Sequence, residues 1–210
     1  MFSRARFYVA LSLFALTTPL YAAEVVLVNG GSGTLTTGDN LDDITNVAAT
    51  VSVVEIPGLT ITASTGASDQ TLNSLSTSFG VDTDGSDDSD RLEGSESFSF
   101  IFNQPVTITE IDFIGLDSAA EFVVNVGGTE ITINEAALSN TSSDLFTPSG
   151  SNLPTFTNIA AGTALDFSIN TGVVGLQGIT LTVVPEPGSL ALLVAATGYV
   201  FFGRRGRLTA

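Results

Sequence analysis

Ser97-Phe98-Ser99-Phe100-Ile101-Phe102 is the stretch that decides the fold class of this 210-residue chain. Its phenylalanines stand at every second position and alternate with serine or isoleucine, which is the two-residue period of a β-strand with one buried face. The three rings are therefore expected to share the core face of one strand. No useful helical periodicity occurs between residues 24 and 184, so this span is predicted to be all-β.

The strand that follows changes face partway along its length. Val106 and Ile108 share one parity, whereas Ile111 and Phe113 occupy the opposite parity. One extra residue in an antiparallel strand produces such a switch. The pattern therefore predicts a β-bulge or a change of face near residues 109–110.

Other segments rich in β-branched residues are separated by clusters of Gly, Asn, Asp and Ser. Pro57-Gly58 and Gly127-Gly128 each lie between two such segments and predict hairpins. Nine or ten short strands in one domain favour a two-sheet, jelly-roll-like β-sandwich, and the uneven connections disfavour an up-and-down barrel. Further strands are expected at 25–29, 47–56, 59–63, 122–126, 131–133, 165–169 and 179–183.

The N-terminal residues are typical of an export signal. Two arginines precede a short apolar run at 7–16, and small residues follow it up to Ala22 and Ala23. This order of a charged region, an apolar region and a cleavage zone predicts a signal peptide over residues 1–23. The mature chain would then start at Ala23 or Glu24. The alternative is an uncleaved N-terminal anchor.

The C-terminal residues form three parts in a fixed order. Val184-Pro185-Glu186-Pro187 is followed by an apolar run at 190–202, and Arg204, Arg205 and Arg207 close the chain. A helix over the apolar run would be about 20 Å long, short of a hydrocarbon core of roughly 30 Å. The arginines are expected to stay cytoplasmic, which places the preceding domain across the inner membrane. By these residues alone, the tail could also be an ordinary short anchor on a stiff stalk.

In the order of these parts, residues 184–210 resemble the PEP-CTERM sorting signal of Gram-negative bacteria that make exopolysaccharide. The resemblance rests on Pro185, Glu186 and Pro187, on the apolar run and on the arginine cluster. It implies recognition by an exosortase, which is a membrane protease, and removal of the tail. It also implies delivery to the cell surface or the polysaccharide matrix, and it assigns no activity to residues 24–183.

The charge of the middle of the chain is strongly negative. Arg91 is the only basic residue between 24 and 184, against 21 carboxylates, which gives that span a formal charge of −20. Such a domain repels phosphate backbones, so no nucleic-acid partner is expected. It attracts cations, and the alternative is that the acidic residues serve only to keep a secreted domain soluble.

One acidic run, at residues 82–93, has a spacing that resembles a calcium loop. Its acids and serine fall at the alternating positions from which oxygen ligands wrap a hard cation. The usual glycine at the sixth position is replaced by Asp87, and the flanks are not helical, so an EF-hand is not predicted. The alternative is a solvated acidic loop. The candidate Ca²⁺ ligands are Asp82, Asp84, Asp88, Asp90 and Glu93.

Residue types in the middle of the chain exclude several kinds of enzyme. The whole chain has no His and no Cys, so a Ser-His-Asp triad and thiolate chemistry are impossible. No phosphate loop, dinucleotide fingerprint or nucleophile elbow is present. A pair of carboxylates for glycoside hydrolysis stays open, because the sequence does not give their separation. No Trp or Tyr lies between 24 and 184, so sugar stacking would have to use Phe.

These observations predict an exported, non-enzymatic component of the bacterial cell surface or exopolysaccharide matrix. Its expected partners are an exosortase, the surface polysaccharide and, transiently, the inner membrane. A calcium-dependent carbohydrate-binding or adhesive module is the second hypothesis. A hydrolase acting on polysaccharide is the third.

Overall fold

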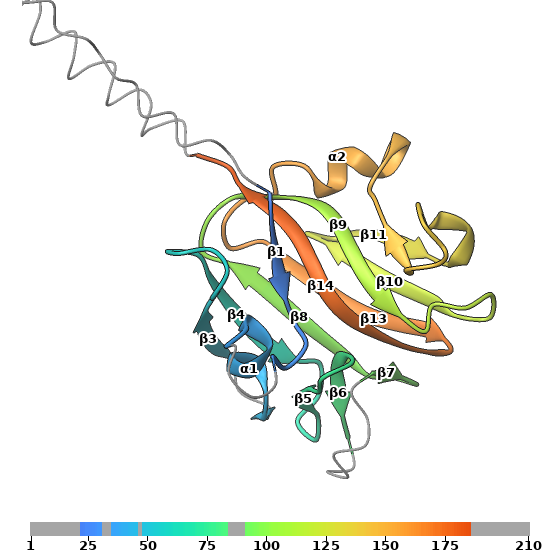
Figure 1. Cartoon of the computed structure of the whole chain (residues 1–210), viewed down its shortest axis with the longest axis horizontal. Coiled ribbons are helices and arrows are strands. Elements are labelled where there is room, and N and C mark those ends of the chain that lie inside the picture. The colour runs from blue at the N-terminus through green and yellow to red at the C-terminus, as the bar shows by residue number, and fades with distance from the viewer. Residues whose placement is uncertain (1–21, 31–34, 46–47, 84–90, 186–210) are drawn as a thin grey trace, which may run out of the picture.

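The described residues form a β-sandwich of two antiparallel sheets (Figure 1). The computed structural model describes residues 22–30, 35–45, 48–83 and 91–185. The signal peptide, except for its last residues, lies outside them, as do Glu186, Pro187, the apolar run and the three C-terminal arginines. Within the described ranges, no helix has the length and apolar character needed to cross a membrane.

The smaller sheet contains six strands in the order β11-β10-β13-β8-β4-β3. Its strands are β3 (Ala49–Ser52), β4 (Thr60–Thr65), β8 (Ser97–Phe102), β10 (Glu121–Val126), β11 (Thr129–Ile133) and β13 (Ala164–Thr171). The hairpins predicted at Pro57-Gly58 and Gly127-Gly128 are both present, as β3–β4 and β10–β11. Both glycines of the second turn have positive φ angles, of 57° and 92°, which favour glycine.

The larger sheet contains eight strands, and β14 lies at its centre. The order is β12-β9-β14-β6-β5-β2, and β1 and β7 also pair with β14. These strands are β1 (Ala23–Val26), β2 (Ile44–Thr45), β5 (Thr71–Ser74), β6 (Phe79–Asp82), β7 (Leu92–Glu93), β9 (Val106–Ile114), β12 (Leu145–Phe146) and β14 (Val173–Val183). The described part of the chain thus contains fourteen strands, more than expected, because several consist of only two to four residues.

The bulge predicted near residues 109–110 is confirmed, and it lies in β9. In the pairing of β9 with β14, Glu110 faces Thr180 and Ile108 faces Leu181, so Thr109 is the extra residue. Because of this insertion, the apolar residues before and after it all point into the core. Val106, Ile108, Ile111 and Phe113 are each at most 1% exposed.

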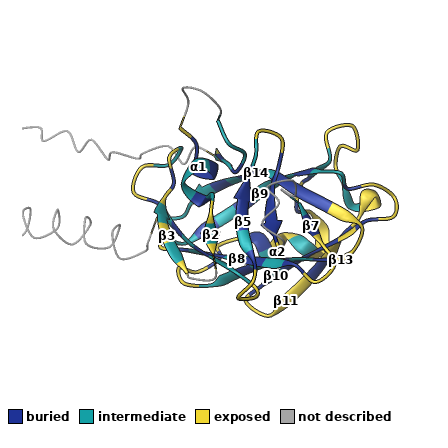
Figure 2. Ribbon diagram, turned by 90° about the horizontal axis from the view of Figure 1, so that it is seen from below, coloured by how far each residue is buried: buried dark blue, intermediate teal, exposed yellow. Residues whose placement is uncertain are grey.

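Phenylalanine rings hold the two sheets together. Phe98, Phe100 and Phe102 share the core face of β8, as predicted, and are at most 2% exposed. Phe98 meets Phe79 of the other sheet edge to face, with ring centroids 5.3 Å apart. Phe113 and Phe122 form a second contact between the sheets at 4.9 Å. The layer of buried residues between the sheets is visible in Figure 2.

Short helices cover the margins of the sandwich. Helix α1 (Thr37–Leu41) begins with a capping box, in which Thr36 and Asp39 exchange hydrogen bonds. These bonds from Thr36 lower the pKa of Asp39. The other helical turns lie between β11 and β13, and they are η1 (Glu135–Ala137), η2 (Gly150–Asn152) and α2 (Leu153–Phe156).

The strand directions divide the connections between two ends of the sandwich. β1 begins and β14 finishes at the same end, because Ala23 pairs with Leu181 (Figure 1). Four connections at this end, here called the terminal loops, are residues 53–59, 103–105, 127–128 and 157–163. The connections at the opposite end, here called the distal loops, are residues 66–70, 94–96, 115–120 and 172.

Candidate functional site

The predicted acidic loop starts and finishes at the distal end of the sandwich. Strand β6 ends at this end of the sandwich with Asp82. Strand β7 begins the chain after the loop, and its Leu92 and Glu93 pair with the first residues of β14. Of the predicted calcium ligands, only Asp82 and Glu93 lie among the described residues. Asp84, Asp88 and Asp90 lie outside them.

The returning chain passes directly over β6, and a glycine makes this crossing possible. A Cβ atom on Gly80 would lie 2.6–2.7 Å from backbone atoms of Arg91, a separation that real side chains do not show. Any other residue at position 80 would push Arg91 and the strand that follows it away from the sheet. Gly80 therefore sets how closely the returning chain approaches β6.

A tight turn after β7 aims a second glutamate at the same place. Gly94 has a φ angle of +59°, and the Glu96 N–H donates to the Glu93 carbonyl oxygen over 3.1 Å. In return, the Glu93 N–H donates to Oε2 of Glu96 over 2.8 Å. These reciprocal bonds fix the Glu96 carboxylate beneath the turn.

Glu96 is a buried acid with hydrogen-bond partners. Only 4% of the residue is exposed. Burial is the main cause of its raised pKa, and the charges of Glu93 and Asp82 add to the effect. Hydrogen bonds from the Glu93 N–H and from the Thr83 hydroxyl act in the opposite direction.

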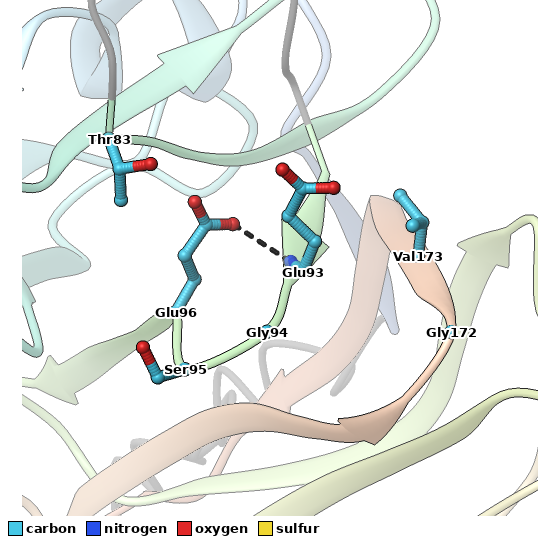
Figure 3. Close-up of a pocket in the computed structure, with 7 residues that line it drawn as sticks. All are labelled: Thr83, Glu93, Gly94, Ser95, Glu96, Gly172 and Val173. Atoms are coloured by element: carbon cyan, nitrogen blue, oxygen red, sulfur yellow. Dashed lines mark hydrogen bonds between the residues drawn. The ribbon is translucent and has the colours of Figure 1, made fainter.

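These residues line an open pocket of about 450 Å³. Figure 3 shows the Glu96 carboxylate between Thr83 and Glu93, with Val173 on the opposite wall. The pocket is polar on one side and apolar at β14. Its lining residues are Thr83, Glu93, Gly94, Ser95, Glu96, Gly172 and Val173.

Carboxylate and hydroxyl oxygens of this kind suit a hard cation such as Ca²⁺. However, no group of three or more His, Cys, Asp or Glu residues with a metal-binding arrangement occurs within the described ranges. The two glutamates alone would supply fewer oxygens than Ca²⁺ takes. Glu96 was not among the predicted ligands, although the Glu93-Gly94-Ser95-Glu96 turn signal was present in the sequence.

A second group of acids lies on the outer face of the larger sheet. Glu24 of β1 pairs with Thr180, and Asp112 of β9 pairs with Gly178. The Glu24 carboxylate lies over Gly178, since its Oε1 would be 2.6 Å from a Cβ atom placed there. Glycine at this position thus brings two carboxylates toward each other. We call Glu24, Glu110, Asp112 and Asp144 the carboxylate surface.

Within this carboxylate surface, Asp112 lacks the partners that Glu96 has. Its Oδ1 atom is buried and has no hydrogen-bond partner among the described residues. Burial is the main cause that raises the pKa of Asp112 to about 6, and the charges of Glu24, Asp144 and Glu110 contribute to this value in that order of size. Asp144, in contrast, accepts hydrogen bonds from the N–H groups of Gly115 and Leu116.

Comparison with known proteins finds no matching family, no curated sequence of significant similarity and no solved structure of significant similarity.

Proposed function

We propose that this protein is an exported, non-enzymatic component of the bacterial cell surface or exopolysaccharide matrix, sorted by an exosortase through residues 184–210. The observation that carries the proposal is the pairing of β1 with β14. It puts Ala23, at the expected signal cleavage site, beside Leu181, a few residues before the sorting motif. Both processing sites would therefore lie at the same end of the sandwich.

A structural role fits the acids better than a catalytic one. Glu96 is held by a main-chain N–H and a hydroxyl, so it is engaged in supporting the turn. Asp112 has a pKa raised to about 6, but it lies on a sheet face and lines neither the pocket beside Glu96 nor a smaller one formed by residues 118–121 and 134–136. A general acid has to reach a bound substrate, which needs a concave site.

We also infer that the sandwich is jelly-roll-like. The support is that the chain repeatedly changes sheet between consecutive strands, as at β4–β5, β8–β9, β9–β10 and β13–β14. Such crossing connections are typical of sandwiches and not of up-and-down barrels.

The sorting proposal is tested by replacing Pro185, Glu186 and Pro187 with Ala in a host that has an exosortase. The wild-type product is expected to lose residues 190–210 and to start at Ala23 or Glu24, whereas the variant keeps its tail. Intact mass and N-terminal sequencing of the surface fraction measure both ends. Ser149→Ala/Ser151→Ala, at exposed positions away from the tail, is the matched control. A wild-type surface protein that retains Arg204 and Arg205 would falsify the proposal.

A calcium-dependent adhesive or carbohydrate-binding module is the second candidate. The specific observation in its favour is that Glu93, a predicted ligand, shares a pocket with Glu96 and the Thr83 hydroxyl. Calcium that binds only the folded state should stabilise it by about 2.7 kcal/mol at a hundredfold excess over Kd. The measurement is Tm with calcium and with chelator, for wild type and Glu93→Gln, with Asp69→Asn as control. An unchanged wild-type Tm at millimolar calcium rejects this candidate.

A further inference from the structure

The two ends of the sandwich differ sharply in charge. The terminal loops contain one ionisable side chain, Glu55. Both of its carboxylate oxygens accept hydrogen bonds from Thr37, one from the N–H and one from the hydroxyl. The rest of these loops presents amide, hydroxyl, backbone and apolar groups, including exposed Pro57 and Ala161. Behind them, Glu24 and Glu130 each lie within two residues of a strand's terminal end, and Asp39 lies in helix α1, whose Thr37 bonds to Glu55.

Acids accumulate at the other end. The distal loops and the strand ends beside them carry Asp69, Asp82, Glu93, Glu96, Asp117 and Glu121. Strand β14 runs between the two ends with eleven residues, or about 37 Å. The Debye length is about 8 Å at physiological ionic strength, so the distal acids lie several Debye lengths from the terminal end.

Only a short segment of chain connects the end of β14 to the apolar run. The Val184 N–H donates to the Pro105 carbonyl oxygen over 2.8 Å, which ties the chain to a terminal loop one residue after β14 finishes. Only residues 185–189 separate this bond from Leu190. Five extended residues span at most about 18 Å. Any membrane that holds the apolar run is therefore within a short reach of the terminal loops.

We propose that the terminal loops rest on a phospholipid surface while the tail is still in the membrane, with the acidic end directed away from the lipid. This inference depends on the proposed function only in taking the apolar run as membrane-inserted. Anionic headgroups repel carboxylates within a Debye length or so, and the terminal loops offer them almost none. Tethering keeps the loops at high effective concentration near the lipid, so weak polar and apolar contacts suffice.

The absence of cysteine allows a direct test of this orientation. The full chain is reconstituted into vesicles of phosphatidylglycerol and phosphatidylethanolamine that contain a headgroup-attached nitroxide lipid. A fluorophore is placed on Ala161→Cys in a terminal loop or on Ser68→Cys in a distal loop, both exposed positions. We expect at least threefold stronger quenching at position 161 than at 68. Equal quenching at the two positions in chains that co-float with vesicles overturns the orientation and leaves the sorting proposal standing.

The role of charge is tested on the same reporter. Thr157→Glu/Ala160→Glu adds two carboxylates to a terminal loop, and Ala67→Glu/Ser68→Glu adds two to a distal loop. The first pair should reduce quenching at position 161 at least twofold at low salt, with recovery at high salt, and the second pair should not. Equal effects of both pairs contradict the proposal. A chain that fails to co-float overturns both this inference and the membrane role of the tail.

Discussion

The turn at residues 93–96, here called the acidic turn, and the carboxylate surface around Asp112 both contain a buried acid, but these acids differ in their hydrogen-bond partners. Each buries an acid next to other acids, and each thereby raises a pKa. Glu96 is supplied with a main-chain donor and a hydroxyl, whereas Oδ1 of Asp112 has no partner among the described residues. Hydrogen bonds to Glu96 therefore offset part of the cost of burying its charge, whereas Oδ1 of Asp112 has no such compensation among the described residues.

Two glycines indicate that the two regions also differ in rigidity. Gly80, beside the acidic turn, is packed against the backbone of Arg91. Gly178, on the carboxylate surface, is covered by the end of the Glu24 side chain, which can rotate away. The difference indicates that the acidic turn is set by backbone packing, whereas the carboxylate surface can adjust to a change in protonation.

The largest effect is expected for Gly80→Ala. The added methyl group collides with the Arg91 backbone, which cannot move without opening the contact between β6 and β7. Overpacking of this kind destabilises by about 3 kcal/mol. Gly178→Ala is the matched control and should lose less than about 1 kcal/mol, since only Glu24 must move. Chemical denaturation measures both, and equal losses would mean that the two regions do not differ in rigidity.

A smaller effect is expected for Glu96→Ala. The substitution leaves the Glu93 N–H and the Thr83 hydroxyl without their buried acceptor, which should destabilise by about 2 kcal/mol. Glu96→Gln retains an acceptor oxygen and should recover at least half of that loss. Thermal unfolding at pH 7 compares the three proteins. A Gln variant as unstable as the Ala variant would show that the charge, and not the hydrogen bonding, holds the turn.

The pH dependence of stability in Asp112→Asn tests the acid that lacks a hydrogen-bond partner. The folded pKa of about 6 lies above the ordinary value of 3.8, so folding favours the protonated acid. Its contribution to stability is present at low pH and is lost as the pH rises from about 4 to about 6. Asp112→Asn should remove this loss and stabilise the protein at pH 7 by about 1 kcal/mol, discounted for partial solvent exposure. Urea unfolding at pH 4 and pH 7 measures the difference, and an unchanged pH dependence contradicts the assignment.

The smallest effect is expected for Glu24→Gln. Glu24 is the strongest of the charges acting on Asp112, so its removal should lower the Asp112 pKa while changing stability by a few tenths of a kcal/mol. The carboxyl ¹³C shift of Asp112 followed against pH reports the pKa. Glu121→Gln, an exposed acid on the other sheet, is the control and should leave the titration unchanged.

Much of the fold could be predicted because its core strands alternate strictly. The β8 phenylalanines, both hairpins and the bulge at Thr109 followed from parity and from Gly-containing turns. The short strands β5, β6 and β7 could not be predicted in this way. They are two to four residues long, and all four residues of β6 are buried, so no alternation is present. Strand β14 also begins at Val173, earlier than expected, because its Gly-containing first half has no clear period.

Less of the candidate site could be predicted. Alternating acids indicated the place of the acidic loop, and Glu93 does line the pocket. The importance of Glu96 depends on a reciprocal turn bond and on burial by distant strands, neither of which spacing reveals. The carboxylate surface was not predicted at all, since it joins residues 24 and 112 through Gly178, and only the sheet register brings them together.

The central position of β14 also determines how the protein carries a mechanical load. A pull on the tail enters β14 along its axis, so its eight paired positions with β9 resist in shear and share the force. A pull that separates the two chain ends acts differently, because Ala23 and Leu181 are adjacent and the four pairs of β1 would open one after another. The sandwich is therefore mechanically strong when held by its C-terminal end alone and weak when stretched between its ends.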